Sequence, residues 1–196
     1  MNEQRQERIL LIAMLISMCI WGVSWSSAKV LSGYGSPTAL AFIRFLFVPV
    51  VLFPIMKMLN LKIKVEKQGY LYVVAAGFFM LCYTLILFKG LQEGKSGKGG
   101  VLVTTATPIF AYIIGLFTCR VLPNKREIIG LSLGVIAGAV LLNIFTYSNT
   151  MLDSSNGYFI TGAFIWAVMR KFSAQANRFG NSISFSFWLN IIVILG

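Results

Sequence analysis

The chain has 196 residues, of which 57% are hydrophobic and only 12% are charged. A soluble domain usually has about 25% charged residues, so this composition excludes an ordinary soluble globular protein and favours a membrane protein. The net charge of +11 does not indicate nucleic-acid binding, because the cations form short clusters between long apolar blocks.

The sequence lacks the residues on which most catalytic and metal sites depend. It contains no His, which removes imidazole acid-base catalysis and most catalytic triads. Cys19, Cys82 and Cys119 lie in apolar blocks without CxxC spacing, which argues against a zinc site or a disulfide framework. A membrane-embedded enzyme would need a cluster of polar catalytic groups at one depth, and the sequence offers none. We therefore predict a protein that is not an enzyme and has no cofactor and no metal.

Seven apolar segments follow one another along the chain. Most approach the length of about 20 residues that a helix needs to cross a bilayer. They predict an all-α transmembrane protein, a polytopic bundle of about seven spans. The predicted spans lie near residues 9–31, 38–56, 70–91, 99–119, 128–146, 157–172 and 183–196.

The connections between these segments are rich in turn-forming or charged residues. Residues 32–37 contain two Gly and a Pro and predict a tight turn, and residues 92–98 form a short polar loop. Residues 57–67 and 120–127 are basic loops, and residues 147–156 are polar.

The distribution of Lys and Arg predicts the orientation in the membrane. With a cytoplasmic N-terminus, 12 of the 17 cations fall on the inside, whereas Lys95 and Lys98 are the cations of the outer loops. Cytoplasmic loops of membrane proteins carry an excess of Lys and Arg. We therefore predict a multi-pass protein of the plasma (inner) membrane with its N-terminus in the cytoplasm.

The last apolar segment is short for a span. As a helix, residues 183–196 would rise about 21 Å, against a hydrocarbon core of about 30 Å. We therefore expect the chain to be an incomplete copy of a longer membrane protein. Such a copy is expected not to transport by itself unless it pairs with another chain.

Three cations, Lys29, Arg44 and Lys89, fall within the first three predicted spans. A cation at the bilayer centre costs about 2.5–3.5 kcal/mol on insertion scales, and these three lie in the outer half. One interpretation is that they extend toward the outer headgroups. The other is a cationic, water-filled vestibule open to the outer half, which would favour anionic or zwitterionic solutes.

Several polar and aromatic residues at mid-span have two interpretations. Trp21, Trp25 and Trp166 could line a solute pathway or fill space, and Ser24 adds a hydroxyl beside the first two. Pro108 follows Thr105 in the fourth segment, where it removes a backbone hydrogen bond. A broken helix at this depth suits a transport pathway, but it is also compatible with a tolerated kink.

Gly130, Gly134 and Gly138 share one face of the fifth segment. Small residues at this spacing let two helices approach closely in lipid. The pattern predicts helix packing, either within the chain or in a homodimer.

Short motifs along the whole chain resemble those of the drug/metabolite transporter superfamily, in its EamA-like branch. The matching residues are Trp21-Gly22 and Lys29, Arg44-Phe45, Thr107-Pro108-Ile109-Phe110, Gly130 to Gly138, and Gly157 to Trp166 followed by Arg170-Lys171. The chain departs from the family pattern at Cys119-Arg120, where an acidic residue is usual, and in the charged connection from Lys89 to Lys98.

The resemblance implies ten helices in two five-helix repeats of opposite orientation, with the solute site between the repeats. Residues 1–150 would then be a complete first repeat, and residues 151–196 the start of the second. It also implies a secondary transporter that exports a small metabolite, an amino acid or a drug-like solute. A membrane receptor or sensor, or an inactive truncated carrier, is the alternative that the residues leave open. The expected partners are the lipid bilayer and a small-molecule solute, without nucleic acid.

Overall fold

The structure is a computed structural model, and it describes residues 3–61, 63–119, 124–141 and 154–196. The described residues form seven α-helices and two short 3-10 helices, without a strand. The α-helices are α1 (Glu3–Ser32), α2 (Pro37–Met58), α3 (Tyr70–Glu93), α4 (Ser96–Cys119), α5 (Lys125–Leu141), α6 (Ser154–Ala176) and α7 (Ser182–Leu195). The 3-10 helices η1 (Lys67–Gly69) and η3 (Asn177–Phe179) precede α3 and α7.

Four helical stretches are long and apolar enough to cross a membrane, and one of them joins η1 to α3. These stretches are Arg5–Ser32, Pro37–Met58, Lys67–Glu93 and Ser96–Thr118, and Ser182–Leu195 is a shorter apolar helix. The helical content and these stretches confirm the predicted all-α transmembrane bundle. Its division into a complete repeat and the start of an inverted one stays a prediction, and the predicted end of the fifth span, residues 142–146, lies outside the described residues.

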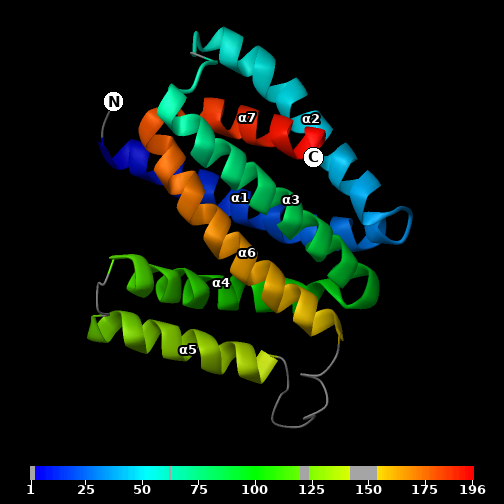
Figure 1. The fold of residues 1–196 in the computed structure, drawn as a ribbon. Helices are drawn as coiled ribbons and strands as arrows, with labels where there is room; N and C mark the ends of the chain where they lie inside the picture. The colour runs from blue at the N-terminus through cyan, green and yellow to red at the C-terminus, as the bar shows by residue number, and fades with distance from the viewer. Residues whose placement is uncertain (1–2, 62, 120–123, 142–153) are drawn as a thin grey trace.

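The sixth and seventh helices pack among the first five (Figure 1). Helix α6 lies between α3 and α4 and contacts both along much of its length, and α7 contacts α2 and α3. Helix α5 packs on the outer side of α4, and α1 contacts α3 and α4. We call the two ends of the bundle the N-terminal end, where α1 begins, and the hairpin end, where residues 33–36 connect α1 to α2.

At the hairpin end, the N-cap of α2 and the side chain of Gln92 form the hydrogen bonds that fix the α1–α2 turn. Ser36 is the N-cap of α2, and its hydroxyl accepts a hydrogen bond of 3.2 Å from the backbone N–H of Ala39. Pro37 occupies the first turn of α2, where its missing N–H costs no helical bond. The side-chain amide of Gln92 on α3 donates to the carbonyls of Ser32 and Gly35, at 3.2 and 3.1 Å. The α1–α2 turn is thereby joined to the end of α3.

The N-terminal end joins the α2–α3 connection to the turn between α6 and α7. The backbone N–H of Glu66 donates to the carbonyl of Phe179 at 3.2 Å, and the Phe179 ring stacks on Tyr72 with centroids 5.8 Å apart. The indole N–H of Trp188 on α7 donates to the carbonyl of Ile63 at 2.8 Å. These contacts connect segments that are more than 100 residues apart in the chain.

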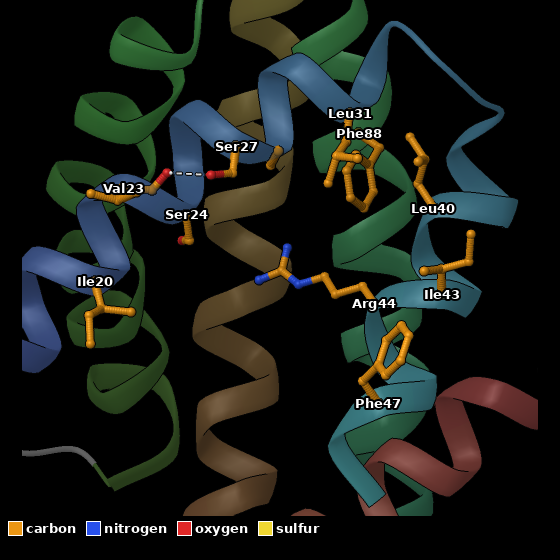
Figure 2. A pocket seen from close by; sticks show the side chains of 11 residues that line it. Ile20, Val23, Ser24, Ser27, Leu31, Leu40, Ile43, Arg44, Phe47 and Phe88 are labelled. Atoms are coloured by element: carbon orange, nitrogen blue, oxygen red, sulfur yellow. Dashed lines mark hydrogen bonds between the residues drawn. The ribbon is translucent and has the colours of Figure 1, made fainter. Parts of the chain in front are cut away.

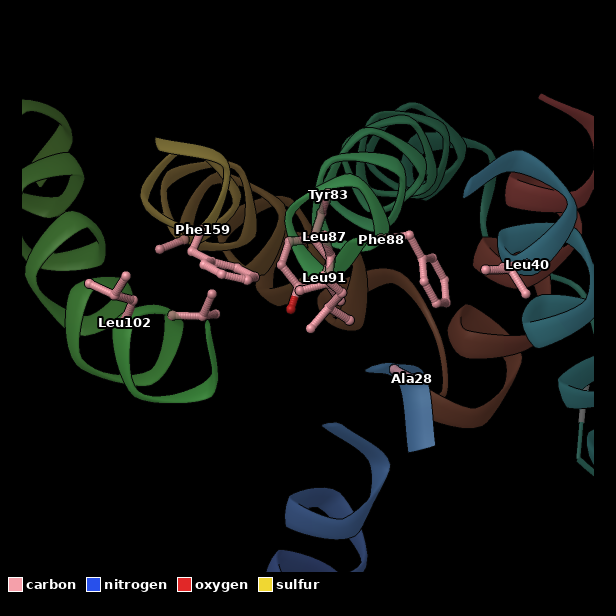
Figure 3. Close-up of a cluster of buried hydrophobic side chains, with 10 residues drawn as sticks. Ala28, Leu40, Tyr83, Leu87, Phe88, Leu91, Leu102 and Phe159 are labelled. Atoms are coloured by element: carbon pink, nitrogen blue, oxygen red, sulfur yellow. The ribbon is translucent and has the colours of Figure 1, made fainter. Parts of the chain in front are cut away.

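Phe159 fills the junction of α3, α4 and α6. Its side chain is fully buried, in a cluster that includes Leu87, Leu91 and Leu102 (Figure 3). A Cβ atom at Gly99 on α4 would lie 2.5 Å from the Phe159 ring, and one at Gly90 on α3 would lie 3.0 Å from it. Small residues at such contacts let membrane helices approach closely, where dispersion contacts stabilise them.

We expect Gly99→Ala to destabilise the protein, because the ring of Phe159 is confined by α3 on its other side and cannot retreat. The usual cost of such overpacking is about 1–3 kcal/mol. Gly97→Ala is the matched control two residues away, since a Cβ atom there would meet nothing within 4 Å. Thermal unfolding in one detergent should give a lower melting temperature for Gly99→Ala than for Gly97→Ala. Equal melting temperatures would contradict the tight junction at Phe159.

Candidate functional site

A cavity opens between α1 and α2 in the half of the bundle toward the hairpin end. Its volume is about 520 Å³, within the range of small-molecule sites. Apolar side chains form most of the lining, and the polar ones are Ser24, Ser27 and Arg44 (Figure 2). We call it the outer cavity, after the orientation predicted from the sequence; its apolar lining consists of Ile20, Val23, Ala28, Leu31, Leu40, Ile43, Phe47 and Phe88.

Arg44 supplies the charge of the outer cavity. Its side chain extends from α2 into the space beside α1, toward Ser24, and it is exposed to the cavity (Figure 2). The guanidinium carbon lies 6.0 Å from the centroid of the Phe45 ring, which is at the limit of a cation–π contact. Among the described residues, no hydrogen bond or ion pair engages this guanidinium. It therefore offers its donors to the cavity.

The two serines of the outer cavity present acceptor oxygens. The Ser24 hydroxyl donates to the carbonyl of Trp21 at 2.6 Å, and the Ser27 hydroxyl donates to the carbonyl of Val23 at 3.2 Å. A hydroxyl that has donated its proton can still accept one. The cavity thus combines a cationic donor, hydroxyl acceptors and an apolar wall.

A small space of about 20 Å³ joins Arg44 to the aromatic residues at the centre of the bundle. It is lined by Trp21, Ser24 and Trp25 of α1, and by Tyr83 of α3. Tyr83 is buried, and its ring packs against Trp166 of α6 with centroids 4.6 Å apart. The sequence analysis missed Tyr83, because an isolated Tyr in an apolar segment carries no distinguishing pattern.

Trp21, Tyr83 and Trp166 form an aromatic layer near the middle of the membrane segments. Trp21 and Trp166 also line a second cavity of about 170 Å³, between α1, α4 and α6. We call this the inner cavity, because it extends from the aromatic layer toward the N-terminal end. Pro108 lines it as well. The structure thus brings together six of the predicted pathway residues: Trp21, Ser24, Trp25, Arg44, Pro108 and Trp166.

Lys29, another predicted pathway residue, has a backbone partner at the hairpin end. Its ammonium donates to the carbonyl of Leu91, in the last turn of α3. Carbonyls in the last turn of a helix lack intrahelical partners and carry partial negative charge, so a cation is well placed there. The contact gives Lys29 a role in joining α1 to α3.

Thr105, the remaining predicted pathway residue, faces α5. A Cβ atom at Gly138 would lie 3.1 Å from its methyl group, and one at Gly134 would lie 3.9 Å from it. Gly130 and Gly134 line a cavity of about 300 Å³ between the two helices, together with Thr105 and Pro108. The glycine face of α5 therefore lies against α4 of the same chain.

Helix α4 continues through Pro108, and the nearby threonines bond toward its start. The hydroxyls of Thr104, Thr105 and Thr107 donate to the carbonyls of Gly100, Val101 and Val103, at 2.7, 2.7 and 2.6 Å. Their protons thus go to carbonyls one turn earlier, not to the Thr104 carbonyl that Pro108 leaves without a donor.

Comparison with known protein families identifies the family of the chain. The sequence profile of the EamA-like transporter family matches residues 8–144, which include most of α1 and all of α2 to α5. The chain belongs to the EamA-like transporter family. This match confirms the resemblance drawn from the sequence motifs. Membrane transport is the general function of this family.

The chain is similar in sequence to the uncharacterized transporter YoaV of Bacillus subtilis (strain 168). The two proteins are 28% identical over 174 residues, which are 86% of this chain and 58% of the relative. The chain thus spans less than two thirds of the length of this relative. No solved structure matches the chain at a significant level.

We expect Lys29→Met to destabilise the protein, because the substitution leaves the carbonyl of Leu91 without its charged donor. Hydrogen bonds to charged groups contribute about 1.5–3 kcal/mol. Arg44→Met is the matched control, since the guanidinium of Arg44 forms no hydrogen bond with the described residues. Melting temperatures in one detergent should fall for Lys29→Met and stay the same or rise for Arg44→Met. The reverse order would contradict the two roles.

Proposed function

We propose that this protein is a secondary transporter that exports small organic solutes bearing an anionic group, such as a metabolite, an amino acid or a drug-like acid. The outer cavity is its solute site. One observation carries the proposal: the guanidinium of Arg44 lies in a mostly apolar cavity of about 520 Å³ and forms no ion pair with the described residues.

The electrostatics of Arg44 favour an anionic ligand. A cation within a membrane segment is costly, and proteins usually offset that cost with an acidic partner or with water. The polar lining of the outer cavity consists of serines and Arg44 itself, so the cavity presents no carboxylate. A carboxylate or phosphate of a solute can accept two parallel hydrogen bonds from a guanidinium, and this pairing strengthens where water is excluded.

The apolar lining favours an organic body on the solute. Ile43, Phe47 and Phe88 line the same cavity as Arg44, and burial of apolar solute surface against them is favourable. The acceptor oxygens of Ser24 and Ser27 suit an ammonium or hydroxyl group on the same solute. An inorganic anion would use Arg44 alone and leave most of the cavity wall without a contact.

Movement of the solute requires the site to open to each side of the membrane in turn. Trp21 and Tyr83 line the small space beside Arg44, and Trp21 and Trp166 line the inner cavity, so in the proposed mechanism this aromatic layer separates the two sides. The proposed mechanism is alternating access between two inverted repeats, the second of which is completed by pairing with another chain. The direction of export rests on the family resemblance, and the cytoplasmic location of the N-terminus rests on the distribution of Lys and Arg.

We expect Arg44→Gln to abolish export of the transported solute. Arg44→Lys should retain part of the activity, since it keeps the charge but loses the bidentate geometry. The measurement is efflux of a panel of amino acids and organic acids from cells that express the protein, with membrane abundance matched between variants. Arg178→Gln is the control, because Arg178 is an exposed cation in η3.

A solute whose export is lost in Arg44→Gln and kept in Arg178→Gln supports the outer cavity as the solute site. Full export by Arg44→Gln at matched abundance would overturn that assignment. Efflux of cationic solutes alone would overturn the proposed solute class.

A further inference from the structure

Arg170 is a second cation that faces a cavity. It lies on α6, one turn after Trp166, and it lines the inner cavity with Trp21, Thr107 and Pro108. Arg170 lies near the end of the predicted sixth span, residues 157–172, and α6 continues beyond it to Ala176. The packing of α6 between α3 and α4, which the sequence did not reveal, makes Arg170 part of a cavity wall.

The neighbouring cation has a different environment. The ammonium of Lys171 donates to the hydroxyl of Thr118 near the end of α4, so its charge joins two helices. Arg170 has no such bond with the described residues, and its side chain is exposed. The lining of the inner cavity contains no carboxylate. Arg170 and Lys171 are adjacent on α6, but Lys171 bonds α4 whereas Arg170 lines the inner cavity.

The inner cavity and the outer cavity lie on opposite sides of the aromatic layer. Trp21 lines the inner cavity and the small space beside Arg44, and Tyr83 in that space packs against Trp166. Arg44 lies in the half of the bundle toward the hairpin end. Arg170 lies 6 residues before the end of α6, in the half toward the N-terminal end.

We propose that Arg170 and the inner cavity form a second anion-binding subsite, on the other side of the aromatic layer from Arg44. The ligand is the carboxylate or phosphate group of an organic anion, held by the planar guanidinium. The subsite's role as a second station for the exported solute rests on the proposed function, whereas its binding of an anion does not.

The geometry of the inner cavity suits a flat or small anionic group. Its volume of about 170 Å³ is smaller than that of the outer cavity, and Trp166 and Trp21 supply flat walls. The hydroxyl of Thr107 donates to the carbonyl of Val103, so it cannot donate to the anion. Arg170 is therefore the charged donor on which recognition of the anion depends, and the indole N–H groups of Trp21 and Trp166 are neutral donors in the same lining. The phosphate of a lipid headgroup has the same chemistry as a solute anion, and the experiment separates these sources.

The test uses Thr104→Cys, because Thr104 is exposed and lines the inner cavity. The background carries Cys19→Ala, Cys82→Ala and Cys119→Ala, and the protein is placed in nanodiscs of zwitterionic phosphatidylcholine. The rates of reaction with an anionic and a cationic methanethiosulfonate reagent are compared. We expect the anionic reagent to be favoured, and Arg170→Gln to lower the anionic-to-cationic rate ratio about fivefold or more.

Three controls make the result specific to Arg170. Lys171→Gln removes the same charge from the next residue and should change the ratio less than about twofold, because Lys171 bonds Thr118. Arg170→Lys should restore most of the ratio. Benzoate, a flat organic anion, should slow the labelling of Thr104→Cys, and Arg170→Gln should remove this protection. The rate with neutral N-ethylmaleimide reports whether each variant keeps its fold at this position.

Nanodiscs that contain anionic phosphatidylglycerol distinguish a solute subsite from a lipid site. Persistence of the charge preference and of benzoate protection in these nanodiscs supports the solute subsite. Loss of both there would assign Arg170 to a lipid headgroup and overturn the proposal. Equal effects of Arg170→Gln and Lys171→Gln would also overturn it. The efflux assay with Arg44→Gln is independent, so either proposal can fail alone.

Discussion

The arrangement of α3, α4 and α6 depends on the packing of the Phe159 ring against Gly90 and Gly99. The ring occupies space that side chains at Gly90 and Gly99 would fill, so α6 approaches α3 and α4 closely. Trp166 follows Phe159 by seven residues, or about two helical turns, and so lies on the same face of α6. This periodicity places Trp166 against Tyr83, and it brings Arg170, one turn further, to the inner cavity. One tight helix junction thus positions the aromatic layer and the second cation together.

The four cations discussed above show how a membrane bundle can use charge in different ways. Lys29 donates to a free carbonyl at a helix end, and Lys171 donates to a hydroxyl on a neighbouring helix. Both bonds join neighbouring helices. Arg44 and Arg170 line cavities instead. A guanidinium suits that position, because its planar fork recognises carboxylate and phosphate better than an ammonium does.

Much of the fold followed from the sequence, and the site followed in part. Apolar segments of membrane-spanning length and intervening turns predicted the helical bundle, because lipid requires every backbone polar group to be bonded within a helix. Arg44 and Trp21 were identifiable since a charge or an indole is unusual at mid-span. Tyr83 and Arg170 were not, because their importance depends on which helix lies opposite them. The pairing of α6 with α3 is a contact between distant parts of the chain, and no local pattern encodes it.

The position of α6 between α3 and α4 has a consequence for biogenesis. Helices leave the ribosome and enter the membrane in chain order, yet α3 and α4 share few contacts with each other and are bridged by α6. The first five helices therefore cannot reach their final packing as an isolated unit while the chain is being made. Their assembly is completed only after Phe159 has emerged, so until then the glycines that will receive its ring face lipid or another protein.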